Sequence, residues 1–336
     1  MKSDKLLLDH GAGGELSHGL TRELFLPAFD NSILNRLEDG AVIGVNGVRL
    51  AFSTDSYTVD PIFFPGGDIG ELAVNGTVND LSMCGADPQY LSAAFIIEEG
   101  FPLPDLNRIV TSMARAAKAA GVSIVTGDTK VVPRGAVDQI FINTSGVGLI
   151  HPDVRVGPDR VTPGDRILLS GAMADHGATV MAQRGQFGLD VSVKSDTAPL
   201  NHMVKRMFAV TRDIHALRDP TRGGVGTALN EIAQKSQVGF RIIEASIPIR
   251  REVAGICDLM GFDPLYLANE GKLLAFVKPE AAESVLAAIR EDTYGKDACI
   301  IGEAVPDPSA RVVMKTRIGG NRIIHMLAGE QLPRIC

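Results

Sequence analysis

Apolar residues change their spacing repeatedly along the chain, from the period of a helix to that of a strand. Between residues 15 and 37, leucines recur at every fourth position, which predicts a helix that Pro27 interrupts. A second helical pattern covers residues 105–120, with Asp105 as the predicted N-cap and Gly121 as the stop. Helices of this kind bury one face, so each is expected to pack on another layer.

The helical pattern from residue 71 to residue 84 has two distinct stripes. Its core stripe consists of apolar residues, Val74, Val78 and Leu81. Its second stripe consists of small or short residues, Ala73, Gly76, Thr77, Asp80 and Cys84. A stripe of small side chains lets another backbone or a ligand come close, and Asp80 lies on that face.

Strand-like runs stand before and after these helices. Residues 41–45 and 48–53 are mostly apolar and are separated by Asn46-Gly47. This pair accepts positive φ at both central positions of a type I′ turn, so the pattern predicts a β-hairpin. Further strands are predicted at residues 89–97, 122–126 and 138–150.

A segment rich in proline and glycine, residues 151–164, is the best candidate for a domain boundary. Beyond it, strands at 166–169, 240–243, 272–277 and 298–301 alternate with helical patterns at 174–184, 224–234 and 279–290, and late strands follow at 311–315 and 322–326. The sequence therefore predicts a mixed α/β (α+β) protein. Its two domains are residues 1–157 and 158–328, and residues 329–336 form a flexible tail.

Composition restricts the class of protein further. Of the 336 residues, 45% are hydrophobic and 22% are charged, a balance that excludes disorder. The 33 basic and 40 acidic residues leave a net charge of −7, which removes the positive field that nucleic acid requires. Residues 6–8 are too short an apolar run for a signal peptide, and no run nears the roughly 18 residues of a membrane span. We expect a cytoplasmic protein.

The 36 glycines gather in clusters, which is typical of backbone that approaches a ligand. Two common nucleotide motifs are absent, since no P-loop precedes Lys272 and the Gly224-Val225-Gly226 segment lacks the last small residue of a dinucleotide fingerprint. The segment from Asp219 to Gly224 runs into a predicted helix, so its glycine N–H groups, Thr221 hydroxyl and Arg222 suit an anion. The alternative is an ordinary Asp-Pro turn.

Three carboxylates stand among small or polar neighbours. They are Asp55 at the end of the hairpin strand, Asp80 on the small-residue stripe and Asp128 just past a predicted strand. Such oxygens suit Mg²⁺, although each alone is better explained as a solvated or capping aspartate. The four cysteines contain no C-x-x-C pair, which favours a reducing compartment, and Cys336 is the terminal residue. Its alternative role is an incidental thiol in a frayed terminus.

These segments together resemble a known family. The motifs that carry the resemblance are H-G-A-G-G-E at 10–15, S-T-D-S at 53–56, N-D-L-S-M-C-G-A at 79–86, T-G-D-T-K at 126–130, D-P-T-R-G-G at 219–224, N-E-G at 269–271 and P-R-I-C at 333–336. They resemble the HypE family of hydrogenase maturation factors. That family belongs to the superfamily of aminoimidazole ribonucleotide synthetase and selenide water dikinase. The internal motifs specify the superfamily, and the terminal motif specifies the family.

The resemblance implies an N-terminal half whose sheet pairs with that of a second subunit to form a barrel across a homodimer, covered by the C-terminal half. It implies ATP and Mg²⁺ as cofactors. It also implies a reaction in which ATP activates a carbamoyl group on a cysteine sulfur and dehydration leaves a thiocyanate, the source of a cyanide ligand for [NiFe] hydrogenase. Alternatives are a related enzyme that acts on a free amide and a non-catalytic carrier switched by ATP.

The resemblance also implies a role for each motif residue. Asp55, Asp80 and Asp128 would hold Mg²⁺; His10, Gly11, Gly13 and Gly14 would close over the phosphates; and Asp219, Thr221, Arg222 and Gly223 would bind a second anion. Cys336 would carry the carbamoyl group, and Lys130 and Glu270 would handle protons, with the choice of base open. The implied partners are HypF as carbamoyl donor and the HypC-HypD complex as cyanide acceptor. Extended, residues 329–336 reach roughly 25 Å, enough for a swinging arm.

Overall fold

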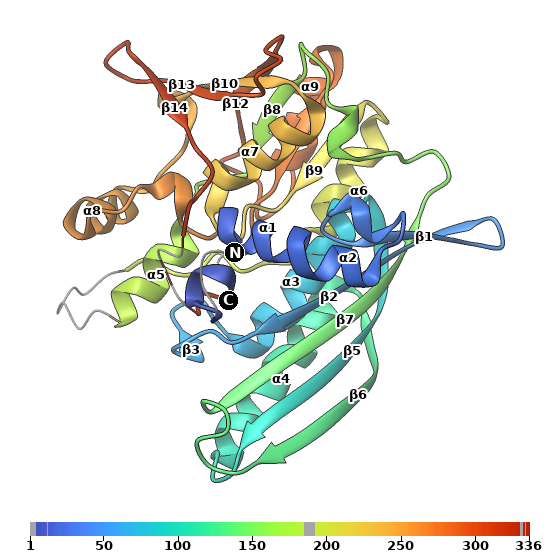
Figure 1. The fold of residues 1–336 in the computed structure, drawn as a ribbon, viewed down its shortest axis with the longest axis vertical. Helices are drawn as coiled ribbons and strands as arrows, with labels where there is room; N and C mark the ends of the chain where they lie inside the picture. The colour runs from blue at the N-terminus through green and yellow to red at the C-terminus, as the bar shows by residue number, and fades with distance from the viewer. Residues whose placement is uncertain (1–4, 12, 185–191, 330–331, 333) are drawn as a thin grey trace.

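Two β-sheets with helices packed on them form the body of the protein (Figure 1). The computed structural model describes residues 5–11, 13–184, 192–329, 332 and 334–336. One sheet is built from residues 41–150 and the other from residues 166–324, so each half of the chain has its own sheet. The mixed α/β class predicted from the sequence is confirmed.

The N-terminal sheet has five strands in the order β1-β2-β7-β5-β6. The strands are β1 (Ala41–Val45), β2 (Val48–Tyr57), β5 (Ala86–Glu98), β6 (Ser123–Val132) and β7 (Ile140–Ile150). All neighbours are antiparallel except β5 and β6, which are parallel. Asn46 and Gly47 have φ of 50° and 82°, so the predicted hairpin between β1 and β2 is confirmed. A small pair, β3 (Phe63–Phe64) and β4 (Gly67–Asp68), precedes the first long helix.

Helices α3 (Ile69–Met83) and α4 (Leu103–Ala120) cover one face of this sheet. The small-residue stripe of α3 lets the sheet approach, as predicted. A Cβ on Gly76 would lie 2.1 Å from the Tyr57 hydroxyl, and Thr77 Oγ1 lies 2.6 Å from Thr144 Oγ1. Close contact between α3 and the sheet therefore depends on the absence of a side chain at position 76.

Two predicted boundaries differ from the structure. Helix α4 ends at Gly121 as predicted, but it begins at Leu103, so Asp105 is not its N-cap. Pro104 occupies the first turn, where a missing N–H costs nothing. Strand β6 runs to Val132, so Asp128 and Lys130 lie within the strand and not past its end. The reason is that β5 supplies pairing partners as far as Glu98, which lies opposite Val132.

The C-terminal sheet has seven strands in the order β14-β13-β10-β12-β8-β11-β9. These are β8 (Arg166–Leu169), β9 (Ile214–Arg218), β10 (Gly239–Ile243), β11 (Leu274–Val277), β12 (Cys299–Val305), β13 (Val312–Lys315) and β14 (Asn321–Ile324). The helices of this half are α5 (Asp175–Arg184), α6 (Asn201–Val210), α7 (Gly224–Ser236), α8 (Arg251–Met260) and α9 (Pro279–Arg290). No helix in the described ranges is long and apolar enough to cross a membrane.

The N-terminal segment folds as a separate helical arm against the C-terminal half. Helix α1 (Glu15–Leu20) continues through a π-helical turn (Thr21–Phe25) into α2 (Leu26–Phe29). Pro27 lies in the first turn of α2, where its missing N–H is tolerated, so it does not interrupt the helical arm, which ends at Phe29. The Glu15 N–H donates to the Leu327 carbonyl at 2.9 Å, so the two ends of the chain meet.

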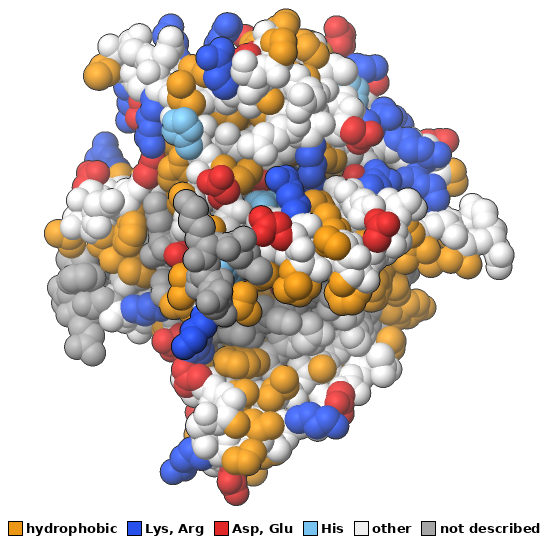
Figure 2. Space-filling view, in the orientation of Figure 1, with side chains coloured by type: hydrophobic (Ala, Val, Ile, Leu, Met, Phe, Trp, Pro, Cys, Tyr) orange, Lys and Arg blue, Asp and Glu red, His pale blue; other side chains and the backbone are white. Residues whose placement is uncertain are grey.

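The face of the N-terminal sheet opposite α3 and α4 is exposed, and we call it the open face. It carries Phe52, Tyr90, Ile96 and Leu149, whose side chains are between 40% and 53% exposed. Hydrophobic side chains are visible over the lower lobe of the space-filling view, where Figure 1 places this sheet (Figure 2). Large apolar side chains on one sheet face are typical of a surface that binds a partner.

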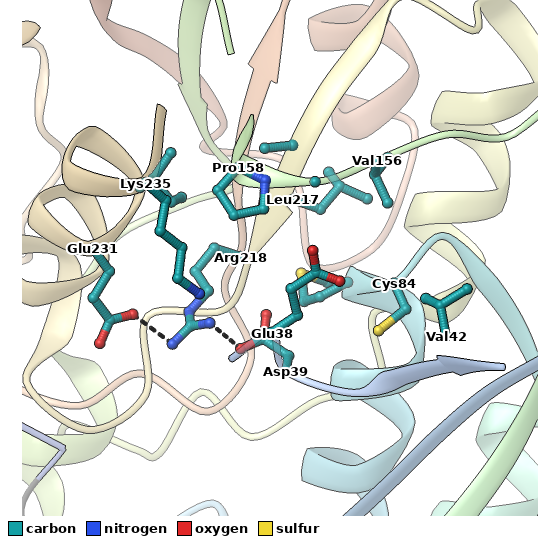
Figure 3. A pocket seen from close by; sticks show the side chains of 14 residues that line it. Glu38, Asp39, Val42, Cys84, Val156, Pro158, Leu217, Arg218, Glu231 and Lys235 are labelled. Atoms are coloured by element: carbon teal, nitrogen blue, oxygen red, sulfur yellow. Dashed lines mark hydrogen bonds and ion pairs between the residues drawn. The ribbon is translucent and has the colours of Figure 1, made fainter. Parts of the chain in front are cut away.

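A buried ion network joins three parts of the chain (Figure 3). Arg218, at the end of β9, pairs with Asp39 before β1 and with Glu231 of α7, the latter at 2.6 Å. His18 of α1 reaches the same Glu231 at 2.8 Å. Both carboxylates are largely buried, with side chains 13% and 10% exposed, and the Arg218 guanidinium is a cation that both of them contact.

Replacing Arg218 is therefore expected to destabilise the protein strongly. Arg218→Ala leaves Asp39 and Glu231 buried without their cation, and we expect the free energy of unfolding to fall by about 3 kcal/mol. The matched control is Arg241→Ala, whose exposed pair with Glu303 is expected to contribute less than about 1 kcal/mol. Urea unfolding of both variants measures the difference, and equal losses would contradict the network's role.

Candidate functional site

Carboxylates from both halves of the chain converge where the two sheets meet. Asp55 lies on β2, Asp80 on α3, and Asp219 directly after β9. Asp80 is half-buried, and the Ser53 hydroxyl donates to its Oδ2 at 2.7 Å. Burial, together with the charges of Asp219, Asp39 and Asp55, raises the pKa of Asp80 well above its ordinary value. The structure therefore brings Asp55, Asp80 and Asp219 into one cluster, as the sequence predicted for the first two.

This cluster holds more negative charge than its cations neutralise. Burial, and next the charge of Asp39, raises the pKa of Asp219 to about 7, although Arg218 opposes the shift. Carboxylate oxygens crowded in this way are the ligands that Mg²⁺ prefers. In the described part of the chain, no three His, Cys, Asp or Glu side chains already stand at metal-binding distance. Mg²⁺ usually keeps water and phosphate ligands, so the donor set fits such an ion.

Arg222 connects the carboxylate cluster to the predicted glycine loop. Its Nη2 lies 3.9 Å from Asp55 Oδ1, and its Nη1 donates to the Gly11 carbonyl at 3.5 Å. Gly13 has φ of 76°, and a Cβ there would lie 3.0 Å from the Arg222 Cβ. Two segments that are more than 200 residues apart in sequence therefore meet at this guanidinium.

The segment after Asp219 is partly a turn and partly the N-terminus of a helix, which are the two alternatives left open by its sequence. Gly223 takes φ of 76° as the N-cap of α7, and the Gly224 N–H donates to the Thr221 carbonyl at 3.0 Å. One of the two glycine N–H groups expected for an anion is thus used within a turn. His10 lies farther along the arm and lines a cavity of about 640 Å³ between α1 and the end of β14.

The end of the chain is docked into this site. The Cys336 carbonyl accepts a hydrogen bond from the Thr58 N–H at 2.9 Å, and the Arg334 carbonyl accepts one from Asp60 at 3.2 Å. Ile335 is buried. Cys336 is the neighbour that does most to raise the pKa of Arg222 above its ordinary value, ahead of Asp55 and Glu270. Within the tail predicted at 329–336, residues 330, 331 and 333 lie outside the described residues.

Glu270 faces the same cluster from the C-terminal half. Its side chain is buried and its Oε1 has no hydrogen-bond partner within the described residues. Burial, and next the charge of Asp196, raises the pKa of Glu270 well above its ordinary value. Burial of this kind favours the neutral form of a carboxyl group. The structure places Glu270 and Cys336 around Arg222, as two of its charged neighbours.

Asp128 and Lys130 lie elsewhere in the chain. They form an exposed pair 3.3 Å apart on β6. Asp128 lies in register with Ala94, then Asn143, then Ser56, so three strand spacings, about 14 Å, separate β6 from β2. Ser56 and Asn143 are on the open face, whereas Asp55 points to α3. One chain alone therefore does not bring Asp128 and Lys130 to the cluster.

Sequence reasoning missed Asp196, which supports Glu270. The Asp196 Oδ1 accepts the Glu270 N–H at 3.0 Å, and its Oδ2 pairs with Lys272 at 3.1 Å. Asp196 lies in an irregular segment without periodicity or a motif, so no local signal marks it. Asp39 was missed for the same reason, since it lies in the turn before β1.

Comparisons with known proteins cover the whole chain. The family model described as AIR synthase related protein, N-terminal domain, matches residues 37–150, and the model of the corresponding C-terminal domain matches residues 162–315. Carbamoyl dehydratase HypE of Azotobacter vinelandii is 48% identical over 336 residues, which cover 100% of this chain and 98% of that protein.

Two solved structures are similar in fold and in sequence. A crystal structure of a HypE-HypF complex matches with a TM-score of 0.87 and 49% identity, covering 92% of this chain and 99% of that one. A crystal structure of the hydrogenase maturation protein HypE in complex with ATP matches with a TM-score of 0.83 and 54% identity, covering 99% and 100%.

The carboxylate cluster leads to a prediction about pH. Because folding raises the pKa of Asp219 from 3.8 to about 7, the folded state holds its proton more tightly than the unfolded state. Its contribution to stability is therefore full below about pH 4 and is lost as the pH rises through 7. We expect Asp219→Asn to remove this loss, as measured by urea unfolding from pH 4 to pH 8. Added Mg²⁺ should raise the unfolding temperature of the wild-type protein more at pH 8 than at pH 5. If the free energy of unfolding had the same pH profile in the wild-type and Asp219→Asn proteins, the raised pKa of Asp219 would be contradicted.

Proposed function

The chain belongs to the AIR synthase related family and, within it, to the HypE carbamoyl dehydratases, and from this premise we propose that it dehydrates a carbamoyl group on its own C-terminal cysteine. The observation that carries the proposal is the docked terminus. Cys336 lies beside Arg222, among the buried carboxylates and Glu270. A terminal residue seated in such a site is suited to be a substrate carrier.

The chemistry follows from the bonds that must change. The carbamoyl group on Cys336 is an S-carboxamide, and its oxygen is a poor leaving group. Transfer of the terminal phosphoryl group of ATP to that oxygen makes it a good one. Loss of phosphate and of the two nitrogen protons then leaves S–C≡N, so ADP and phosphate account for the water removed. Phosphoryl transfer depends mainly on positioning and on neutralising charge.

The residues of the cluster would have different roles in this reaction. Asp55 and Asp80 would hold Mg²⁺, which supplies positive charge to the phosphates when it is bound. Arg222, held against Gly11 and Asp55, offers a second cation to an anion. Glu270 is a candidate to exchange protons with the nitrogen, because burial raises its pKa and its Oε1 has no hydrogen-bond partner within the described residues.

A mass measurement on the carbamoylated protein tests the function directly. After HypF has loaded Cys336 and the protein has been desalted, added ATP should remove the mass of one water from the C-terminal peptide. An enzyme acting on a free amide would never be carbamoylated, and a carrier would keep the full mass. Asp80→Asn, which keeps the shape and removes the charge, should load normally, retain its fold and lose no water. Wild-type dehydration in that variant would remove Asp80 from the metal site.

We propose that the active protein is a homodimer joined through the open face. This face exposes large apolar side chains, and the neighbouring edge strand β6 carries the exposed Asp128 and Lys130. Packing two open faces together would cover the apolar residues and could complete a barrel from the two sheets. It would also bring Asp128 and Lys130 of each chain toward Asp55 and Cys336 of the other.

The tail then has to reach outside the dimer. HypF would load Cys336, and the HypC-HypD complex would accept the cyanide, so the terminus would leave the site and return. The related HypE-HypF complex supports the first of these partners. None of the four cysteines, all of which lie in the described ranges, forms a disulfide, and a thiol carrier suits a reducing cytoplasm.

A mixing experiment tests whether Lys130 acts across the dimer. Lys130→Ala and Cys336→Ser chains, each inactive alone, are unfolded together and refolded as mixed dimers. A mixed dimer would contain one complete site, so random pairing should restore about a quarter of the wild-type rate. The matched control pairs Glu270→Gln with Cys336→Ser and should stay inactive, because Glu270 and Cys336 meet within one chain. An inactive first mixture would assign Lys130 to its own chain.

A further inference from the structure

The docked tail is held through each of its last backbone carbonyls. The carbonyls of Arg334 and Cys336 accept hydrogen bonds from Asp60 and Thr58, in the order of an antiparallel pair. In such a pair, the carbonyl of the residue between two hydrogen-bonded residues points away from the partner strand. That carbonyl belongs to Ile335, the residue directly before the reactive thiol, and its partner comes from α5.

The partner is His176, near the start of α5. His176 Nε2 lies 2.7 Å from the Ile335 carbonyl oxygen, and Nδ1 lies 2.8 Å from Ser195 Oγ. Because a carbonyl only accepts, Nε2 carries a hydrogen, and in the neutral ring Nδ1 then accepts from the Ser195 hydroxyl. The ring is fully buried and packs edge-on against Phe64, with 5.4 Å between the ring centroids. Its orientation is thus fixed on three sides.

Other contacts of α5 agree with this role. Arg184, at the far end of the same helix, donates to the carbonyls of Arg334 and Asp60. Helix α5 therefore contacts both the tail and the segment with which the tail pairs. Burial lowers the pKa of His176 and so favours the neutral ring, the form in which Nε2 donates to the tail and Nδ1 accepts from Ser195.

We propose that His176 is a positioning residue for the reaction, which holds Cys336 in the site by donating to the Ile335 carbonyl. This inference rests on the proposed function for its purpose, but the docking itself is a property of the free chain. The hydrogen bond ends one residue before the thiol, so it sets the depth to which Cys336 enters.

The expected consequence is a shift between docked and released tail. Without His176, the Ile335 carbonyl is buried unpaired when the tail is docked and is solvated when the tail is released. We expect His176→Ala to weaken docking on the order of tenfold, the factor that corresponds to about 1.4 kcal/mol.

Hydrogen exchange at Thr58 and Asp60 measures docking without any catalytic assay. Both amides donate to the tail, so they should exchange about tenfold faster in the His176→Ala protein than in the wild type. A chain without residues 333–336 provides the fully released reference. His202→Ala is the matched control, because His202 also lies 2.9 Å from a backbone carbonyl, that of Ala119, far from the tail. It should leave both amides unchanged.

Two more variants and one rate complete the test. His176→Gln, whose amide N–H can reach the same carbonyl, should restore most of the protection. Ser195→Ala removes the hydroxyl that fixes the His176 tautomer but leaves the His176 ring in the core. It should also accelerate exchange at Thr58 and Asp60, and it replaces His176→Ala if that variant does not fold. The single-turnover rate of dehydration should fall as docking weakens, while the ATP concentration at half-saturation stays unchanged. Wild-type exchange in a folded His176→Ala protein would overturn the proposal. A wild-type protein that never dehydrates would refute the proposed function but leave the exchange result decisive.

Discussion

The site depends on one electrostatic constraint, the burial of several carboxylates beside only two guanidinium groups. Asp39 and Glu231 share Arg218, and Asp55 with Glu270 and the chain terminus share Arg222. What the arginines leave uncompensated appears as the raised pKa values of Asp80, Asp219 and Glu270. A cation bound with its phosphate ligands would relieve this excess. The same constraint involves the chain terminus, because Cys336 is the neighbour that does most to raise the pKa of Arg222.

Local patterns in the sequence predicted those parts of the fold that local physics determines. Asn46-Gly47 specifies a two-residue turn by its tolerance of positive φ, and the hairpin formed there. The small-residue stripe of α3 predicted a close approach, and Gly76 meets Tyr57. Motifs also marked Asp55, Asp80, Arg222, Glu270 and Cys336, which the structure brings together. Their assigned roles remain predictions.

Features of the structure that depend on residues distant in sequence could not be predicted from local patterns. Strand β6 extends six residues beyond its predicted end because β5, and not its own composition, supplies the pairing. Asp196, Arg218 and His176 act through residues 13 or more positions away in sequence, and nothing next to them marks that role. The separation of Lys130 from Glu270 follows from strand order, which a list of motifs does not contain.

The length of β6 has a consequence for the newly made chain. Ten residues of an edge strand offer unpaired N–H and C=O groups to any other strand, and edges of this kind nucleate aggregation. Asp128 and Lys130 are the charged residues on that edge, and charges are the usual protection against mispairing. In the proposed homodimer this edge would be covered, whereas in a single chain it stays available for mispairing. Loss of the charge at position 130 would therefore lower the soluble yield, so the rate per soluble chain is the quantity that separates chemistry from aggregation.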